Sequence, residues 1–313
     1  MISPFFKNAV IYRLKKESAI TSEDYIQELA DKLEKLRFTP CASHDFSTCG
    51  WVPPLGDLSD QLYHFASGQL LLTLRKEEKI LPSQVITDEL NKRVSEVEHQ
   101  QTRRLKKSEK AYIRDDVIYS LLPRAFTRNS TTSIWINMAQ SLVVVDAGSI
   151  SRAEDALAVL RKSLGSLPVV PLMMQSPIEL TLTEWVKTGK FPAGFTPGSE
   201  AELKGILGCD GVGFFRKQDL VSDEILTHIE AGKVVVELSL DWQGRISFKL
   251  TDYFSIKRIK FSDDTLSQND DIDREEVAHR FDADFVLMTG ALNNLLYYLI
   301  DALGGETKSQ DGN

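Results

Sequence analysis

A long helical pattern with a strongly basic side lies in the middle of this 313-residue chain and restricts how the chain can fold. From residue 83 onward, apolar residues recur at intervals of four and three, as in an amphipathic helix. The window from Lys92 to Arg128 holds ten basic and five acidic residues, a net charge of +5, whereas the whole chain carries −8. One side of such a helix can pack while the other faces solvent or a ligand. We therefore predict a helical arm over residues 83–126.

The basic side of this predicted arm has a regular spacing. On one uninterrupted helix, five cations fall within about 100° of arc, and Leu105 and Tyr112 fall on the opposite, packing side. A row of cations at helical spacing matches a phosphate backbone. Val117 would also fall on the basic arc, which indicates a bend near Asp115 or burial against a partner. The five cations are Arg103, Lys106, Lys107, Lys110 and Arg114.

A second basic cluster follows directly, and both clusters have a plainer interpretation. In LLPRAFTR, Arg124 and Arg128 flank Phe126. An aromatic ring between arginines can stack on a base or anchor a protein partner, although a core phenylalanine is commoner. A charged helix face can also serve solubility alone.

The remainder of the sequence predicts an α+β fold with antiparallel sheets and helices packed on one face. The clearest signal is a three-stranded meander over 233–240, 245–250 and 256–261, with Gln243 and Gly244 in its first turn. Other strands are predicted at 8–14, 69–74, 133–147 and 167–172, and helices at 21–37, 151–164, after Pro177 and at 273–303. The charged run 75–79 is expected to leave its strand.

These elements suggest three structural units. Residues 1–82 and 127–175 form an α+β core domain, 83–126 form the helical arm with its basic stripe, and 176–313 form a C-terminal α+β domain. Residues 190–199, rich in Pro and Gly, are the best linker candidate.

Cysteine content and hydropathy bear on the compartment. Three cysteines, Cys41, Cys49 and Cys209, are too few and too odd for a disulfide framework. No apolar run approaches the roughly 20 residues of a membrane span. A cytoplasmic location is expected.

Enzyme motifs are weak throughout. No phosphate-binding loop is present, and Gly208, Gly211 and Gly213 do not fit a dinucleotide fingerprint, so no cofactor is expected. Four residues superficially resemble zinc ligands, but their spacing is not that of a structural site: Cys41, His44, Cys49 and His64. Nine acids between 263 and 284 could hold Mg²⁺ for a nuclease, yet their spacing suits a solvated loop and a helix start. No metal site is predicted.

Several phrases, spread over nearly the whole chain, resemble the RdgC family of bacterial recombination-associated proteins. They are FTPC (38–41), GWVPPLG (50–56), RKEEKILP (75–82), LLPRAF (121–126), LRKSLGSLPVVPL (160–172), IELTLTEWV (178–186), KQDL (217–220), HIEAGKVV (228–235), DIDREE (271–276) and RFDADFVLMTG (280–290).

The resemblance implies a non-enzymatic, cytoplasmic, nucleoid-associated protein. Such a protein binds double- or single-stranded DNA without much sequence preference and limits access of a RecA-type recombinase. It also implies a homodimer closed into a ring, with a positively lined hole for DNA. Two other functions stay open: a metal-dependent nuclease using the acids of 263–284, and an adaptor that contacts the recombinase with little DNA binding.

Residues are assigned to these roles from charge, periodicity and the resemblance together. Because a closed ring needs contacts at both ends of each protomer, two self-complementary patches are expected, and one is placed at Leu121, Leu122 and Phe126. The expected DNA contacts are Lys76, Lys79, Arg103, Lys106, Lys107, Lys110, Arg114, Arg124, Arg128 and Lys217.

Overall fold

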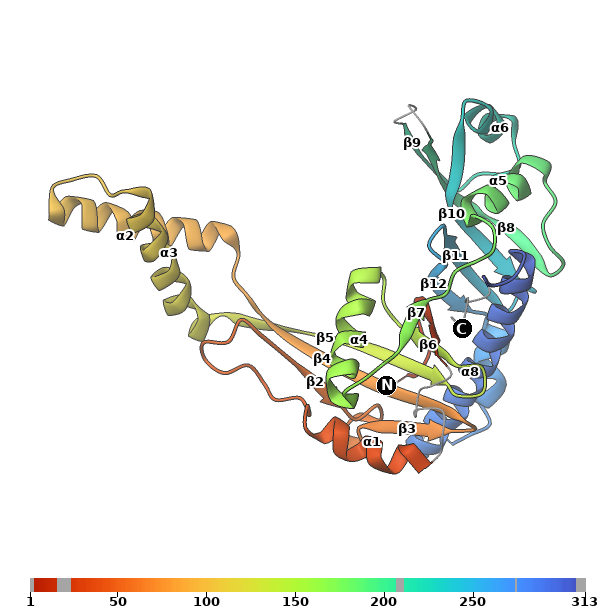
Figure 1. Cartoon of the computed structure of the whole chain (residues 1–313), viewed down its shortest axis with the longest axis horizontal. Helices are drawn as coiled ribbons and strands as arrows, with labels where there is room; N and C mark the ends of the chain where they lie inside the picture. The colour runs from red at the N-terminus through yellow and green to blue at the C-terminus, as the bar shows by residue number, and fades with distance from the viewer. Residues whose placement is uncertain (1–2, 16–23, 207–210, 274, 308–313) are drawn as a thin grey trace, which may run out of the picture.

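The computed structural model describes residues 3–15, 24–206, 211–273 and 275–307. The expected first turn of the helix at 21–37 and Cys209 lie outside the described residues. The described chain forms a crescent, with a helical hairpin at one end and the strands β8–β10 with helices α5 and α6 at the other (Figure 1).

The strands form one continuous antiparallel sheet, ordered β2-β4-β5-β6-β1-β12-β11-β10-β8-β9, with β3 beside β4 and β7 beside β1. The N-terminal half of the sheet comprises β1 (Ala9–Leu14), β2 (Ser47–Val52), β3 (Tyr63–Ala66), β4 (Gln69–Ile80), β5 (Phe126–Asn137), β6 (Leu142–Val145) and β7 (Val169–Pro171). The C-terminal half comprises β8 (Phe195–Gly205), β9 (Val212–Arg216), β10 (Lys233–Trp242), β11 (Ile246–Thr251) and β12 (Ser255–Phe261). The α+β prediction and the meander β10–β12 are confirmed.

β1 joins the two halves. It pairs with β6 on one side and with β12 on the other, where the paired residues are Ala9 with Ile256 and Val10 with Ser255. Because this pairing continues the sheet, side-chain faces can be followed from the N-terminal half into the C-terminal half.

Helices cover both faces of the sheet, so the expectation of helices on one face was wrong. Val10 and Tyr12 of β1 pack with α1 (Asp24–Glu34) and α4 (Ile150–Leu164). Ala9 and Ile11, which point the opposite way, share a core with α8 (Val277–Ala302). We call these two sides the α4 face and the α8 face. Figure 1 shows α4 on the inside of the crescent, and α8 lies on the outside.

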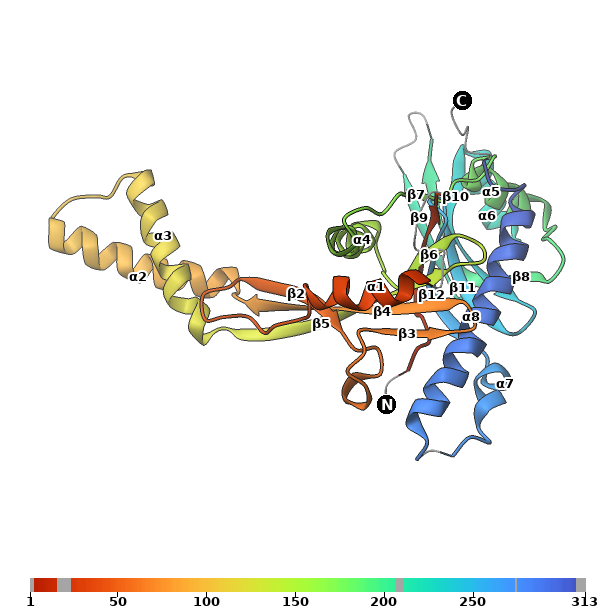
Figure 2. The same ribbon diagram turned by 60° about the horizontal axis from the view of Figure 1, so that its bottom comes forward.

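The closing helix α8 is the one helix in the described part of the chain that is long and apolar enough to cross a membrane by length and composition. Its apolar residues recur at helical spacing and are buried against the sheet: Phe281, Phe285, Met288, Leu292, Leu295, Leu296 and Leu299. α8 is therefore a core helix of this fold. In Figure 2, α7 (Asp263–Leu266) lies beside its first turns.

The predicted long helix is in fact two helices. α2 (Ser83–Gln101) ends at Thr102, whose φ of 53° is left-handed, and α3 (Lys107–Leu121) runs back beside it. Leu105 in the connection is buried, and its backbone N–H donates to the Glu98 carboxylate at 2.9 Å. The break therefore lies near Thr102 rather than near Asp115.

The α2–α3 arm, residues 83–124, stands at the end of the long strands β4 and β5, as Figures 1 and 2 show. Val94 and Val117 are buried between its helices. Burial of Val117 inside the arm explains its position on the expected basic arc. Tyr112, expected to pack, is 74% exposed.

The charged run 75–79 does not leave the sheet. It continues β4 to Ile80, paired with β2 on one side and β5 on the other. Two ladders of backbone hydrogen bonds hold this segment extended. On one face Lys76 and Glu78 stay accessible, whereas Glu77 on the other face is 8% exposed and accepts from the Cys41 backbone N–H at 2.7 Å.

The remaining short elements lie in the C-terminal half. α5 (Ile178–Thr188) begins after Pro177, and α6 (Asp223–Glu230) precedes β10. The expected linker at 190–199 merges into β8, because Phe195, Ala201 and Leu203 are core residues of that strand.

Candidate nucleic-acid interface

The base of the α2–α3 arm presents cations on the α4 face. Leu70, Leu72 and Leu74 of β4 pack into the α4 core, so the alternation of the strand places Lys76 and Glu78 on the same face. Arg128 of β5 lies opposite Glu78 in the register. The sheet therefore brings two predicted DNA-contact residues, Lys76 and Arg128, together.

One carboxylate lies between these two cations. The Glu78 carboxylate is 2.8 Å from Lys76 Nζ and 3.1 Å from an Arg128 guanidinium nitrogen. Hydrogen bonding to Lys76, and then to Arg128, lowers the pKa of Glu78 below its ordinary value. Both cations stay accessible, since the Lys76 and Arg128 side chains are 46% and 70% exposed.

A polar cavity of about 490 Å³ adjoins this pair and reaches the start of α4. Arg152, which sequence reasoning missed, lines it and donates through Nε to Thr132 Oγ1 at 2.9 Å. Serine hydroxyls on β5 and at the start of α4 complete the lining. The residues around the cavity are Leu74, Lys76, Glu78, Arg128, Ser130, Thr132, Ser149, Ser151, Arg152, Asp155 and Ala156.

Lys79 points away from this cavity. Its odd position in β4 places it on the face opposite to Lys76, where Nζ donates to the Leu122 carbonyl at 3.1 Å. The structure does not bring Lys79 together with Lys76 and Arg128.

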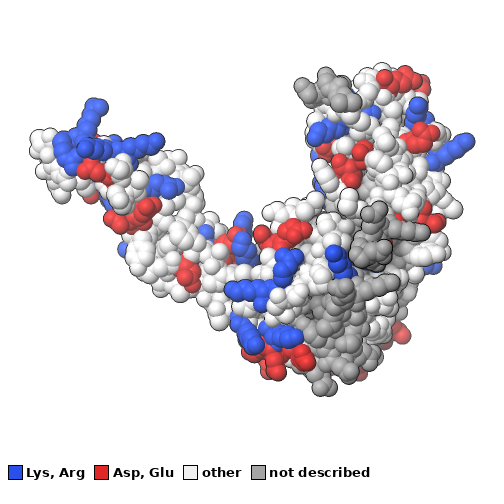
Figure 3. Space-filling view, in the orientation of Figure 1, with Lys and Arg blue, Asp and Glu red and all other residues white. Residues whose placement is uncertain are grey.

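At the tip of the arm, the five predicted cations do not share one helix. Arg103 lies in the α2–α3 connection and Lys106 is the N-cap of α3, whereas Lys107, Lys110 and Arg114 belong to α3. The expected stripe was wrong as a helical stripe, because the chain reverses between Thr102 and Lys106. The residues nevertheless cluster around the tip, and Figure 3 shows Lys and Arg atoms gathered there.

Two of the tip cations are engaged in ion pairs. Arg103 and Glu109 lie 2.6 Å apart, and Lys110 Nζ is 3.1 Å from Glu98. Hydrogen bonds from Arg103 and from the Lys106 backbone N–H lower the pKa of Glu109 to about 2.

The other tip cations point to solvent. Arg104, Lys106, Lys107 and Arg114 are exposed, and none of them forms an ion pair within the described residues. The tip is therefore the part of the described surface where these cations are most directly available to an anion.

The three residues assigned to the dimer patch, in the segment around the end of α3, differ in their exposure to solvent. Phe126 is 84% exposed at the start of β5, and Arg124 is also exposed. Leu122 is 1% exposed, so its side chain is used inside the protomer and is not available to a second copy. Leu121 is half-buried.

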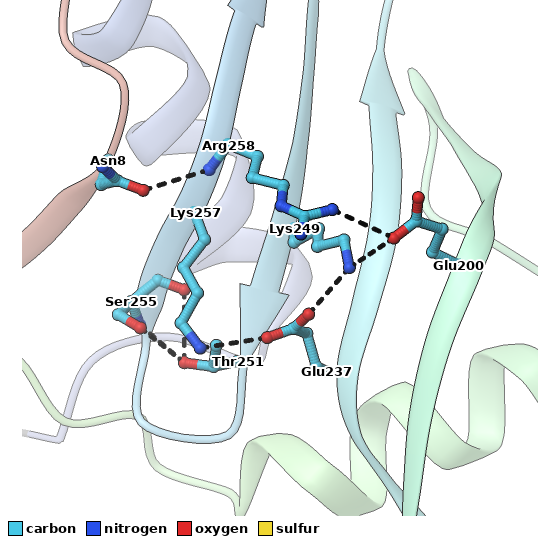
Figure 4. A network of polar contacts seen from close by, with 8 residues as sticks. All are labelled: Asn8, Glu200, Glu237, Lys249, Thr251, Ser255, Lys257 and Arg258. Carbon is cyan, nitrogen blue, oxygen red and sulfur yellow. Dashed lines mark hydrogen bonds and ion pairs between the residues drawn. The ribbon is translucent and has the colours of Figure 1, made fainter. Parts of the chain in front are cut away.

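The C-terminal half carries a basic ladder that sequence reasoning missed. Lys249 of β11 lies opposite Lys257 of β12 in the register, and Arg258 follows in a left-handed conformation. Two carboxylates join these cations, as Figure 4 shows. Glu200 lies 2.7 Å from Lys249 and 3.3 Å from Arg258, and Glu237 lies 3.0 Å from both Lys249 and Lys257. We call these five residues the meander network. Lysines alternating with core residues in β11 and β12 were the available signal.

The meander network lies on the α4 face. Ile256 belongs to the α8-side core and pairs with Ala9 of the same core, so the adjacent Lys257 points to the side of Val10 and Tyr12. Lys249, its neighbour in register, points the same way. Lys76 and Lys257, 181 positions apart in the sequence, thus share one face of one sheet.

Lys217, the last predicted contact, lies in the same half. It is exposed in a left-handed turn directly after β9, with φ of 57°. No ion pair of Lys217 occurs among the described residues.

Comparison with known proteins identifies the group to which this sheet and arm belong. The model of a family described as "Putative exonuclease, RdgC" matches residues 4–306. The chain belongs to the RdgC family. Proteins named "Recombination-associated protein RdgC" from Serratia proteamaculans, Salmonella typhimurium and Salmonella typhi are each 54% identical over 304 residues, which covers 97% of this chain and 99% of the relative. The resemblance predicted from the sequence phrases is confirmed.

The exonuclease in the RdgC family description raises the question of catalytic carboxylates. In the 263–284 segment, Asp270 pairs with Arg280, Asp282 with His64, and Asp284 accepts from Asn269. Across the described residues, no group of three His, Cys, Asp or Glu side chains is arranged to hold a metal ion. The acids of this segment are therefore spread over separate partners instead of converging.

Proposed function

We propose that this RdgC-family protein binds DNA without sequence preference and limits the access of a RecA-type recombinase by occupying the DNA. The observation that carries the proposal is the placement of cations. Four cations of the arm tip are exposed without an ion pair in the described residues, and Lys76 and Arg128 of the arm base share the α4 face, inside the crescent, with the meander network. The name of the relatives, "Recombination-associated protein RdgC", supports a role in recombination.

Contacts from such a surface would go to phosphates. Lysines on the flat face of a sheet and at a helix-hairpin tip can neutralise a phosphate backbone, which positions a duplex without reading its bases. Affinity should therefore vary little with sequence and depend strongly on salt.

A second copy of the chain completes the proposal. The crescent is open on the α4 side, and two copies facing each other would enclose DNA in a ring in the nucleoid. Phe126, with Leu121 beside it, is our candidate for one of the contacts between copies, because a side chain that is 84% exposed at the arm base has no cover within the described chain. Burying an exposed aromatic ring is a common way to stabilise such a contact.

Titration of random-sequence duplexes at about 50 and about 200 mM salt tests the DNA-binding proposal. We expect similar affinities across sequences and a fall of at least tenfold at the higher salt. Affinity that does not change with salt would contradict phosphate contact.

Nuclease activity is the alternative that the family description favours. It would appear as Mg²⁺-dependent loss of full-length DNA, abolished by Asp→Asn changes at Asp270, Asp282 and Asp284. Intact DNA after prolonged incubation with Mg²⁺ is the result expected from the separated carboxylates.

A further inference from the structure

The α4 face repeats one arrangement three times. A glutamate lies between two cations at Glu78 in the arm base, and again at Glu200 and Glu237 in the meander network. In each case the carboxylate contacts both cations within 3.3 Å. A carboxylate presents two oxygens to cations much as a phosphodiester presents its two non-bridging oxygens.

The meander network differs from an ordinary surface ion pair in its burial. The Lys249 and Glu237 side chains are 13% and 17% exposed, whereas Lys257 and Arg258 are 37% and 62% exposed. Although burial raises the pKa of Glu237, Lys249 and Lys257 hold it below the ordinary value, so the carboxylate stays charged. The network thus has a fixed inner pair and two outer cations that can reach solvent.

The outer cations, Lys257 and Arg258, are the ones that a phosphate can reach. Lys257 and Arg258 each contact one carboxylate, whereas Lys249 contacts both. The Arg258–Glu200 pair, with side chains 62% and 29% exposed, is the more exposed of the two outer pairs and therefore the weaker. An incoming phosphate can bind the outer cation while Lys249 stays paired with Glu200 and Glu237. The exchange requires no movement of the strands.

We propose that Lys257 and Arg258, supported by Lys249, form a phosphate-binding site for nucleic acid in the C-terminal half. Glu200 and Glu237 occupy the positions of phosphates until DNA displaces them. Glu78 does the same for Lys76 and Arg128. This inference rests on the proposed DNA binding and adds the residues that limit its strength.

Removing the built-in competitors should therefore strengthen binding. Each cation released from a glutamate can neutralise one more phosphate. The slope of log affinity against log salt concentration then becomes more negative by about 0.9, so the ratio of the affinities measured at salt concentrations that differ fourfold grows about threefold. The test compares duplex binding by the full-length protein and by E78Q, E200Q and E237Q at two salt concentrations.

The matched control is E275Q, which adds the same unit of charge at an exposed residue outside the α4 face. We expect E275Q to bind like the unchanged protein and the other three variants to bind more tightly. The salt slope should become more negative by about 0.9 in E200Q and E237Q, which each free one outer cation, and by about 1.8 in E78Q, which frees Lys76 and Arg128. K257Q and R258Q should weaken binding and make the slope less negative by about 0.9 each, and thermal melting checks that all variants are folded.

The outcomes separate the inference from the proposed function. If the unchanged protein binds DNA but E200Q and E237Q match E275Q, or K257Q and R258Q have no effect, the meander site is wrong while DNA binding stands. If the unchanged protein shows no salt-dependent DNA binding, the proposed function itself fails.

Discussion

The arm tip and the meander network both concentrate lysine and arginine, but the surrounding structure treats the charges differently. At the tip, Lys106, Lys107 and Arg114 extend from a two-helix hairpin and form no ion pair within the described residues. In the meander, Lys249 and Lys257 stand on adjacent strands and share Glu237. The comparison shows that the number of cations on a surface does not measure how many are available to a ligand.

Changing the tip should have the largest effect on DNA binding. Reversing three exposed cations in K106E/K107E/R114E removes about three phosphate contacts and adds repulsion, so we expect affinity to fall on the order of a hundredfold at moderate salt. Fluorescence anisotropy with a labelled duplex measures the change.

The control for this variant is K162E/K187E/K190E, which makes the same charge change at exposed lysines outside the tip. It should lose far less affinity. Equal losses in the two triple variants would mean that net charge, rather than the tip, governs binding. The tip cations would then be no more available to DNA than other exposed cations.

Packing within the arm should have an intermediate and local effect. Val117 is fully buried between α2 and α3, so V117A leaves a cavity that costs about 2 kcal/mol. Hydrogen exchange should then quicken in α2 and α3 and stay unchanged in β10–β12. Faster exchange in the meander as well would show that the arm and the sheet unfold as one unit.

The smallest expected effect concerns the titration of Glu109. Because Arg103 lowers its pKa to about 2, the carboxylate's stabilising contribution is present above the ordinary value near 4.5 and is lost only as the pH falls toward 2. Carbon-detected NMR of the side chain should show this low midpoint. In R103Q the midpoint should move up toward the ordinary value, and an unchanged midpoint would mean that the Arg103 pair does not control it.

Local sequence signals were sufficient for much of the fold. The turn at Gln243 and Gly244 was predictable because Gly244 tolerates the positive φ of a tight turn, and the alternating strands on either side fix its register. The break at Thr102 was not, since threonine rarely adopts a left-handed conformation and the reversal depends on burial of Leu105.

The candidate site was predictable only in part. Lys76 and Arg128 were identified from charge and family resemblance, and the structure places them side by side through Glu78. The shared face of Lys76 and Lys257 depends on the pairing of β1 with β12, residues far apart in the sequence. No local pattern contains that information.

The join at β1 has a mechanical consequence. Strand pairing connects the two halves through two residue pairs, while α8 crosses the outside of both, with Phe281 against His64 of β3 and Tyr298 against Trp242 of β10. The two halves of the sheet are thus joined by a short stretch of strand pairing, and α8 packs behind that junction. Side chains along α8 therefore contact both halves of the sheet and, together with the β1–β12 pairing, fix how the two halves are oriented.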